Sequence, residues 1–389
     1  MIQKDKTEER IIFIDDAHVL GGTQIALGWS IRALLGNSQA EIVCVCPAKT
    51  RAVIERIVGN NPRLEFVECP SALPLNLFAY PLRLLPFFRI ISSLRRRPVR
   101  SWWLNLAGIE FCLAPLLVLR TFGETPRAYL HNTQTFLFFN RKAQWPRRAL
   151  SLLRDLLADR LLFRLYPLVV APSQSSEAEI IARIRNDSRP ATGYLYYPPI
   201  GKDTEESILP VAPVRSDGPI DLWMIGHVNF GHKNNLVALD VLQELTKLGR
   251  TVTLTIVGDG PDSDTFKCVA KRLGIDSKID YRGWLQAPWE SVPRNALVFI
   301  PSLFETMNLV AREAMKRGIR LAASPIPVFR EWIPGPLLAR NFSIPAFVEK
   351  IVEVEAMSSS ELSTLYLGAL ARFSNEIFVK GFQRYSDSM

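Results

Sequence analysis

Two glutamates lie at a spacing that could hold a ligand carrying both a phosphate and hydroxyl groups. Glu305 follows Leu297–Ile300, an apolar run typical of a buried parallel strand. Glu313 stands eight positions later, in a stretch whose apolar periodicity predicts a helix. The N-terminus of such a helix offers backbone N–H groups and a positive dipole end to a phosphate, and a carboxylate accepts hydrogen bonds from hydroxyls. Considered alone, the pair also fits two solvated acids that flank an ordinary helix.

The elements around these glutamates predict a βαβ unit. Gly318 ends the helix, and a second apolar run, residues 319–323, predicts the next strand. In open α/β sheets, ligands bind in the crevice beyond the carboxyl ends of the strands, and Glu305 follows such an end. A diphosphate at the helix N-terminus, with sugar hydroxyls near Glu305 and a ribose near Glu313, would fit this arrangement. The residues therefore favour a nucleotide sugar as the ligand.

The surroundings of the pair, S-x-x-E-T-x-x-L-x-x-x-E-A-M from Ser302, resemble the E-x7-E motif of family 4, the retaining glycosyltransferases with the GT-B fold. The resemblance implies that Glu305 binds hydroxyls of the donor sugar and that Glu313 binds the ribose. It also implies that backbone amides of the intervening turn hold the donor phosphates, namely those of Thr306, Met307, Asn308 and Leu309. The family usually has glycine where Asn308 stands, and we expect the turn to persist because asparagine tolerates unusual backbone angles.

Three further segments of the second half resemble the same family. Its G-R-x5-K pattern is matched at Lys233, which the resemblance places against the donor diphosphate as the counter-charge for the leaving group. His227 stands where the arginine is expected, so a single hydrogen bond would replace the bidentate contact of a guanidinium. Gly258 lies in the loop GDGPD, which resembles the family's loop beside the nucleotide. Trp284 follows the predicted strand 279–282, and the resemblance places its backbone near the base.

The first half of the chain offers a glycine pair. Gly21 and Gly22 follow the predicted strand 11–14 and precede a predicted helix, 24–35. A helix N-terminus of this kind can bind a phosphate, although a plain tight turn explains the pair equally well. The resemblance assigns both glycines to the donor diphosphate. Asp16 and His18, in the loop between strand and helix, are candidates for binding the acceptor, and this loop lacks the further ligands that a metal site would need.

His131 follows the predicted strand 128–130. A lone histidine at such a position is more often structural than catalytic, but the resemblance places a histidine here, close to the donor sugar. The predicted catalytic set is therefore His131, Lys233 and Glu305. No metal and no cofactor is expected, because the resemblance implies an enzyme that uses the nucleotide sugar itself as co-substrate.

A chain of 389 residues is long enough for two domains of ordinary size. Predicted strands and helices alternate in both halves, which indicates doubly wound parallel sheets. We expect an α/β protein of GT-B architecture, in which two Rossmann-like domains face each other across a cleft. An acceptor-binding domain, residues 1–200, would be joined by a linker, 201–219, to a nucleotide-sugar-binding domain, 220–370. Residues 371–389 would form a tail that returns to the first domain.

The net charge of +9 is unevenly distributed. Arginines cluster near residues 95–100 and 141–148, and residues 147–165 predict a helix with leucines on one face and arginines on the other. Such a helix could lie on an anionic membrane surface, or it could pack its leucines against its own domain. A nucleic-acid partner is not expected, because no nucleic-acid-reading motif accompanies the charge.

The N-terminus and the cysteines bear on location. Residues 1–10 are polar and lack the apolar core of a signal peptide, and no apolar run reaches the length of a membrane span. The five cysteines show no C-x-x-C pattern, and Cys44 and Cys46 fall in an apolar strand, which favours core residues over a disulfide framework or a zinc site. We expect a cytoplasmic protein, or one held at the inner face of the cytoplasmic membrane.

The function predicted from these residues is the retaining transfer of a hexose from a nucleotide diphosphate sugar to a saccharide or lipid-linked saccharide, in surface polysaccharide or lipopolysaccharide assembly. The wording H-K-N-N at residues 232–235 resembles mannosyl- and rhamnosyltransferases, so GDP-mannose is the expected donor. No carboxylate nucleophile stands out, which favours front-side attack. Two alternatives stay open: a nucleotide-sugar-binding protein without transferase activity, prompted by His227 and Asn308, and a GT-B sugar-nucleotide epimerase or hydrolase.

Overall fold

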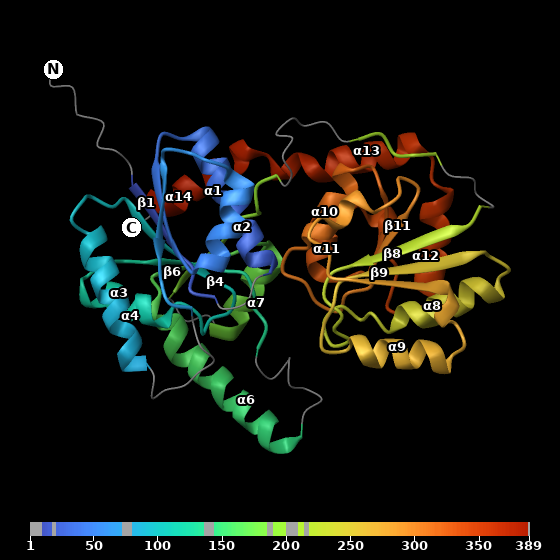
Figure 1. The fold of residues 1–389 in the computed structure, drawn as a ribbon, viewed down its shortest axis with the longest axis horizontal. Helices are drawn as coiled ribbons and strands as arrows, with labels where there is room; N and C mark the ends of the chain where they lie inside the picture. The colour runs from blue at the N-terminus through green and yellow to red at the C-terminus, as the bar shows by residue number, and fades with distance from the viewer. Residues whose placement is uncertain are drawn as a thin grey trace. The chain divides into compact units, whose positions relative to one another are not determined.

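The computed structural model describes residues 10–17, 21–71, 80–135, 144–184, 190–199, 209–213 and 218–387. The chain divides into two compact units (Figure 1). Unit 1 comprises Met1–Lys202 and Phe373–Met389, and unit 2 comprises Asp203–Arg372. The acceptor-binding candidate His18 lies outside the described residues.

A parallel sheet of seven strands forms the centre of unit 1, in the order β3-β2-β1-β4-β5-β6-β7. Its strands are β1 (Arg10–Ile14), β2 (Glu41–Cys46), β3 (Leu64–Glu68), β4 (Ser101–Leu106), β5 (Arg127–Leu130), β6 (Leu168–Ala171) and β7 (Ala191–Tyr194). The inner strands are buried along almost their whole length, which explains their continuous apolar runs. The sequence did not predict β7, because its four residues form no apolar run and pair with β6 at the edge of the sheet.

Helices connect these strands, and they include the helices predicted near 24–35 and 147–165. They are α1 (Gly22–Asn37), α2 (Ala48–Val58), α3 (Tyr80–Leu94), α4 (Leu113–Thr121), α6 (Trp145–Leu157) and α7 (Gln174–Ile184). The helix predicted at 147–165 is therefore shorter than expected, since α6 continues as one turn of π-helix, Ala158–Leu162, and a 3-10 turn, Phe163–Leu165. Cys44 and Cys46 are buried in β2, as predicted.

The C-terminal helix α14 (Asn375–Asp387) completes the core of unit 1. The Phe382 ring stacks on the Trp103 ring of β4, with centroids 4.5 Å apart, and lies 5.7 Å from the Phe13 ring of β1. The buried Arg127 of β5 donates from Nε to the Tyr385 carbonyl, at 2.6 Å. These contacts join residues more than 250 positions apart in the sequence, so unit 1 depends on both ends of the described chain.

Unit 2 contains a second parallel sheet, of five strands, in the order β10-β9-β8-β11-β12. Its strands are β8 (Ile220–Ile225), β9 (Val252–Val257), β10 (Ile279–Gly283), β11 (Leu297–Ile300) and β12 (Arg320–Ala323). Its helices are α8 (Val237–Lys247), α9 (Ser263–Arg272), α10 (Leu309–Lys316), α11 (Pro327–Trp332), α12 (Ile344–Ala356) and α13 (Ser359–Leu370). The predicted α/β class, with a doubly wound parallel sheet in each half, is confirmed.

Part of the segment expected to be a linker packs against unit 2. Leu209 N–H donates to the carbonyl of Lys316 at 3.0 Å, and Arg320 Nη1 donates to the carbonyl of Ala212 at 2.6 Å. Val211 is buried beside them. Residues 209–213 are thus held by the end of α10 and the start of β12, and this corrects the prediction of a linker over all of 201–219. Among the described residues, no helix combines the length and apolar content that crossing a bilayer requires.

Candidate functional site

Two loops of unit 2 leave the sheet where its strand order reverses. β8 has β9 on one side and β11 on the other, so the sheet extends in opposite directions from the β8–β11 pair. Loops that leave the carboxyl ends of such a pair diverge and leave a crevice for a ligand. Here they are residues 226–236, after β8, and residues 301–308, after β11. The first loop carries Lys233 and the second carries Glu305.

Backbone and amide contacts fix these two loops against each other. Asn234 adopts a left-handed conformation with φ of 55°, which asparagine tolerates, and its Nδ2 donates to the Pro301 carbonyl at 3.2 Å. Leu303 N–H donates to the His232 carbonyl at 2.9 Å. The left-handed residue directly after Lys233 turns the chain, so the lysine side chain is positioned by the backbone on both loops.

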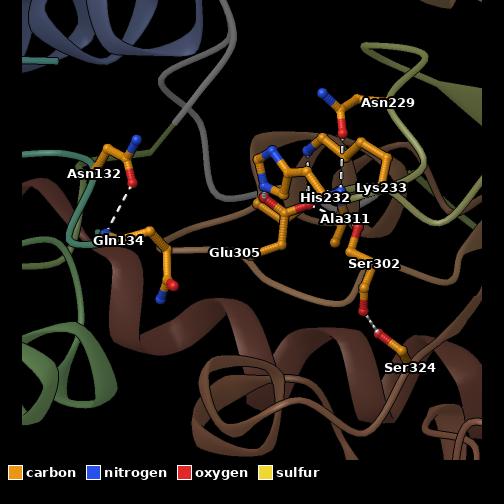
Figure 2. Close-up of polar contacts among 10 residues, drawn as sticks. Asn132, Gln134, Asn229, His232, Lys233, Ser302, Glu305, Ala311 and Ser324 are labelled. Atoms are coloured by element: carbon orange, nitrogen blue, oxygen red, sulfur yellow. Dashed lines mark hydrogen bonds and ion pairs between the residues drawn. The ribbon is translucent and has the colours of Figure 1, made fainter. Parts of the chain in front are cut away.

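The carboxylate of Glu305 is the centre of a polar cluster (Figure 2). Its Oε1 accepts three hydrogen bonds, from Lys233 Nζ at 2.6 Å, from Ser302 Oγ at 2.8 Å and from Asn308 Nδ2 at 2.9 Å. Its Oε2 lies 3.8 Å from His232 Nε2. Glu305 is 8% exposed, whereas the Lys233 side chain is 22% exposed. One carboxylate oxygen is therefore saturated by the protein, and the other keeps capacity to accept a hydrogen bond.

The surroundings of Glu305 keep it ionised. Burial raises the pKa of the Glu305 carboxyl. The electrostatic effects of Lys233 and His232 oppose burial, as do the hydrogen bonds from Lys233 and Ser302, and together they bring the pKa below its usual value. The carboxylate is consequently charged at neutral pH. A buried, ionised carboxylate with a free lone pair is suited to accept a hydrogen bond from a hydroxyl.

His232 belongs to this cluster, although the sequence analysis assigned it no role. Burial, and next the charge of Lys233, lower the pKa of His232 to about 4, against the smaller opposing effects of Glu305 and of a hydrogen bond to the Phe304 backbone. The imidazole is therefore neutral at pH 7. Its Nε2 is buried and has no hydrogen-bond partner among the described residues. The signals in the sequence were its position directly before Lys233 and its place in the H-K-N-N stretch at 232–235.

Asn308 begins α10, but it does so differently from the expectation. Its φ of −90° and ψ of 110° are extended, so no left-handed conformation is needed where the family usually has glycine. The side chain instead has two partners: Oδ1 accepts from the Ala311 N–H at 2.8 Å as a helix N-cap, and Nδ2 donates to Glu305. Met307 is buried beside it, and Thr306 and Leu309 are half-buried. The turn thus places the N-terminus of α10 next to Glu305.

Glu313 lies on α10, and its carboxylate is held by a residue outside the cluster at Glu305. Trp289 Nε1 donates to Glu313 Oε2 at 2.8 Å. Burial raises the pKa of the Glu313 carboxyl, and the hydrogen bond from Trp289 and the charges of Arg317 and Arg312 oppose this without cancelling it. Trp289 was not predicted as a site residue, because it belongs to none of the motifs and its contact joins positions 24 residues apart.

The remaining predicted donor-binding residues of unit 2 follow the carboxyl ends of β8, β9 and β10. His227 and Trp284 are exposed there, after β8 and β10 respectively. Gly258, after β9, has φ of 137°, and a Cβ on it would lie 1.9 Å from the Gly226 carbonyl oxygen. Glycine at position 258 is therefore explained by structure alone, because it lets the loops after β8 and β9 approach each other closely. Of these residues, His227 acts electrostatically on His232 of the cluster at Glu305.

In unit 1, the predicted glycine pair lies at the start of α1. Gly21 is the N-cap of the helix, both glycines are exposed, and a Cβ on Gly21 would meet no atom within 4 Å. Gly21 N–H donates to Gln24 Oε1 at 2.9 Å, and Gln24 Nε2 donates to the buried Asp15 at 3.1 Å. The prediction that this N-terminus binds a phosphate is compatible with its exposure.

His131 is buried, and both of its ring nitrogens have partners. Nε2 lies 2.6 Å from Asn105 Oδ1, and Nδ1 contacts the Tyr197 hydroxyl. Because Asn105 Nδ2 donates to Asp15 at 2.6 Å, its Oδ1 must accept, so His131 donates from Nε2 and accepts at Nδ1. Burial lowers the pKa of His131 to about 3. The histidine predicted as catalytic is thus a neutral member of a buried network, which suits it to shape its surroundings rather than to contact a ligand.

Asp16, a predicted acceptor-binding residue, also faces inward. Its Oδ1 accepts from the Cys112 N–H at 2.9 Å, and Cys112 holds a left-handed φ of 56° at the start of α4. Asp16 is buried. The side chain therefore stabilises an unusual turn between β4 and α4. This contact gives Asp16 a structural role that does not require an acceptor substrate.

Comparison with known structures identifies the architecture. The structure aligns with the apo form of the lipopolysaccharide outer core galactosyltransferase WaaB over 97% of this chain and 99% of the other, with a TM-score of 0.66 at 21% identity. Anabaena HepE, in complex with UDP and glucose, aligns over 98% and 100% with a TM-score of 0.71 at 15% identity. The chain has the GT-B fold. Sucrose-phosphate synthase from Thermosynechococcus elongatus aligns with the same GT-B architecture at a TM-score of 0.71 and 15% identity, over 97% and 98% of the two chains.

Sequence comparison matches a family model to unit 2 and finds two curated relatives of part of the chain. Residues 219–356 match the family described as Glycosyl transferases group 1. A lipopolysaccharide 1,6-galactosyltransferase from Salmonella typhimurium is 24% identical over 181 residues, which are 44% of this chain and 50% of that one. The Escherichia coli K12 protein of the same description is 27% identical over 121 residues, 30% of this chain and 33% of that one. The matched stretches thus span half or less of these curated relatives.

Proposed function

We propose that this GT-B protein is a glycosyltransferase of lipopolysaccharide assembly, which transfers a hexose from a nucleotide diphosphate sugar to a saccharide or lipid-linked saccharide. The observation that carries the proposal is the contact between Lys233 and Glu305 at the β8–β11 crossover of unit 2. The match of residues 219–356 to Glycosyl transferases group 1 and the similarity to lipopolysaccharide 1,6-galactosyltransferases support it. We further propose that the nucleotide sugar is the only co-substrate and that the reaction needs neither a metal nor another cofactor.

The diphosphate of the donor would be held by Lys233 and the N-terminus of α10. An ammonium group carries three donor hydrogens, and the contact with Glu305 occupies one of them. Two remain for phosphate oxygens, on a side chain that is partly open to solvent. The first amides of α10 add donors and a positive dipole end beside the same lysine. Together they would neutralise the charge that develops on the diphosphate as it leaves.

The sugar would be held by the two acceptor atoms left over in the cluster. Glu305 Oε2 and His232 Nε2 lie 3.8 Å apart. Since Glu305 is ionised and His232 is neutral, with its other nitrogen engaged by the Phe304 backbone, both atoms can accept hydrogen bonds. Two acceptors at that separation fit two neighbouring hydroxyl groups of a hexose. Glu313 would hold the ribose of the same donor, as the motif implies.

The proposed reaction retains the configuration at the anomeric carbon. The acceptor hydroxyl attacks from the face that the diphosphate leaves, so that a new carbon–oxygen bond forms as the bond between the anomeric carbon and the phosphate oxygen breaks. The hydroxyl proton passes to an oxygen of the departing phosphate. Lys233 and the α10 N-terminus stabilise the negative charge on that phosphate, and Glu305 keeps the sugar oriented. His131, which is buried in unit 1, would support the neighbouring backbone without taking a proton.

The donor is proposed from the relatives and from the sequence of this chain. HepE was solved with UDP and with UDP-glucose, and the curated relatives are galactosyltransferases, so a UDP-hexose is the first candidate. GDP-mannose is the second, because residues 232–235 read H-K-N-N as in mannosyltransferases. The cluster at Glu305 would contact the sugar and the phosphates rather than the base, so it is compatible with either nucleotide.

A nucleotide panel followed by a transfer assay tests the proposal. The melting temperature of the full chain is measured with UDP-, GDP- and dTDP-sugars, because a ligand that binds the native state raises it. Sugar release and transfer to a lipopolysaccharide core acceptor are then followed by mass spectrometry, with and without acceptor. Stabilisation and acceptor-dependent transfer are expected. Stabilisation without turnover would instead establish a binding protein, free sugar in equal amounts with or without acceptor would establish a hydrolase, and conversion of the donor sugar to its epimer would establish an epimerase.

A further inference from the structure

Large apolar side chains are exposed in one short stretch of unit 1. Seven of the eighteen that are exposed among the described residues lie between positions 145 and 161. They are Trp145, Leu150, Leu152, Leu153, Leu156, Leu157 and Leu161. The six leucines are each 39–58% exposed and Trp145 is 78% exposed. Single exposed leucines are ordinary on a protein surface, but a contiguous set marks a surface that binds another apolar partner.

The helix that carries these side chains is turned with its apolar face outward. Its buried positions are Ser151, Asp155 and Ala158, which recur at the spacing of one helix face. Leu153 and Leu157 lie on the opposite face. The sequence left open whether the leucines pack on their own domain, and in the structure a serine, an aspartate and an alanine occupy the inner face instead.

The orientation of α6 is fixed by the residues that follow it. Asp159 pairs with Arg183 of α7, with Oδ1 and Nη2 2.7 Å apart. The Arg183 guanidinium also lies over the ring of Phe163, 5.1 Å from its centroid, and Phe163 is fully buried. The π-turn and the 3-10 turn thus anchor the helix to unit 1, while α6 itself extends away from the sheet (Figure 1). The leucines are therefore presented by a fixed element.

The charge presented beside the leucines is positive. Four exposed arginines flank the apolar face: Arg147, Arg148, Arg160 and Arg164. The five arginines between positions 144 and 165 outnumber the two acids there, of which Asp155 is buried and Asp159 is paired with Arg183. An apolar stripe bordered by guanidinium groups complements a surface that is apolar beneath a layer of phosphates.

We propose that α6 docks unit 1 on the surface of an anionic phospholipid bilayer. The leucines enter the boundary between headgroups and acyl chains, the arginines contact lipid phosphates, and Trp145 lies at the interface, where tryptophan is enriched. This docking is independent of the proposed transferase activity, since α6 carries none of the residues assigned to the nucleotide sugar. It would bring the enzyme to an acceptor that is itself embedded in a membrane.

Vesicle binding by the full chain tests the docking. The protein is sedimented with vesicles of phosphatidylethanolamine and phosphatidylglycerol, and with vesicles of phosphatidylcholine. We expect binding to the anionic vesicles and a fall of at least about tenfold in the partition coefficient for the double variant L153S/L157S, because two apolar side chains no longer enter the bilayer. The matched control L248S/L367S replaces two leucines exposed on unit 2 and is expected to bind as the wild type does.

Two further measurements separate a bilayer from other occupants. R147Q/R148Q should weaken binding to the anionic vesicles and reduce its salt dependence, while binding to phosphatidylcholine stays the same. Brominated lipids should quench wild-type tryptophan fluorescence more than that of W145F. The proposal is overturned if the full chain ignores anionic vesicles, or if L153S/L157S binds them as well as the control. It is equally overturned if sedimentation velocity shows that this variant abolishes self-association of a chain that binds no vesicles, since a second copy is then the occupant. UDP-sugar stabilisation of unit 2 is measured in parallel and is expected to be the same in every variant.

Discussion

Lys233 Nζ lies 2.6 Å from Glu305 Oε1, and this contact joins the loop after β8 to the loop after β11. The two residues are 72 positions apart and meet where the sheet of unit 2 reverses its strand order. Because the lysine keeps donors that a phosphate could use and the glutamate keeps an oxygen that a hydroxyl could use, this one ion pair would serve both halves of a nucleotide sugar under the proposed function. The two halves can be separated experimentally.

Substitution of either residue should affect different parts of the donor. K233A is expected to weaken binding of the nucleotide diphosphate and of the nucleotide sugar alike, by at least about tenfold, since a charge-assisted hydrogen bond is lost. E305Q is expected to leave nucleotide diphosphate binding near the wild-type value and to weaken only the sugar-bearing donor. Calorimetric titration of both ligands checks this, with K271A as a control on an exposed lysine of unit 2. Equal losses for both ligands in E305Q would contradict the assignment of Glu305 to the sugar.

Asn308 should have two separable contributions to unit 2. N308A removes the N-cap of α10 and is expected to lower the free energy of unfolding by about 1 kcal/mol or more. N308D keeps a cap acceptor but brings a second carboxylate to Glu305, which raises the pKa values of the pair. The destabilisation by N308D should therefore shrink as pH falls from 8 to 5, whereas that by N308A should not. Urea unfolding at several pH values measures both, and a pH-independent N308D penalty would argue against the contact.

The buried His131 should make unit 1 sensitive to acid. Its pKa of about 3 lies below the usual 6.5, so the unfolded chain binds the proton more readily and stability is lost as pH falls from about 6.5 towards 3. Between pH 7 and pH 5 this amounts to about 2 kcal/mol. Burial raises the pKa of the neighbouring Asp15, which acts in the opposite direction, but H131Q leaves Asp15 in place. Hydrogen exchange of β4 and β5 should show the acid sensitivity in the wild type and a smaller one in H131Q.

The same substitution at two glycines should give opposite outcomes. G258A places a Cβ 1.9 Å from the Gly226 carbonyl oxygen at a φ of 137°, and we expect it to destabilise unit 2 by more than about 3 kcal/mol. G21A places a Cβ where no atom lies within 4 Å, so stability should change by less than about 1 kcal/mol. Any loss of diphosphate affinity in G21A would then report on the ligand. Thermal unfolding and ligand titration of both variants check these outcomes, and a stable G258A would contradict the close approach of the two loops.

The sheet of unit 2 could be predicted because its strands are continuous apolar runs. Leu297–Ile300 and residues 319–323 flank a stretch with helical periodicity, and the structure has β11, α10 and β12 there. The edge strand β7 could not be predicted in this way. Its sequence, Ala-Thr-Gly-Tyr, is half-exposed, and the strand forms through pairing with β6 rather than through its own composition. Long-range pairing is invisible to a periodicity argument.

Within the site, motif spacing indicated Lys233 and Glu305, and the structure brings them together. Spacing could not indicate His232 or Trp289, because their contacts arise from the fold. The His232 ring lies near Glu305, and Trp289, in the 3-10 turn Pro288–Glu290, reaches Glu313 on α10. Nor could it indicate that His131 is enclosed between Asn105 and Tyr197. The leucine periodicity of α6 predicted an apolar helix face, but it could not predict that this face is exposed, since an amphipathic pattern does not state which face meets solvent.

The position of α14 has a consequence for biosynthesis. Unit 2 is one uninterrupted stretch of chain, whereas the sheet of unit 1 requires Phe382 against Trp103 and Phe13 before its interior is closed. On the ribosome, the earlier-made strands of unit 1 must therefore wait, incompletely covered, while the whole of unit 2 is synthesised and can fold. Unit 1 is thus the first to be synthesised and the last to complete its folding.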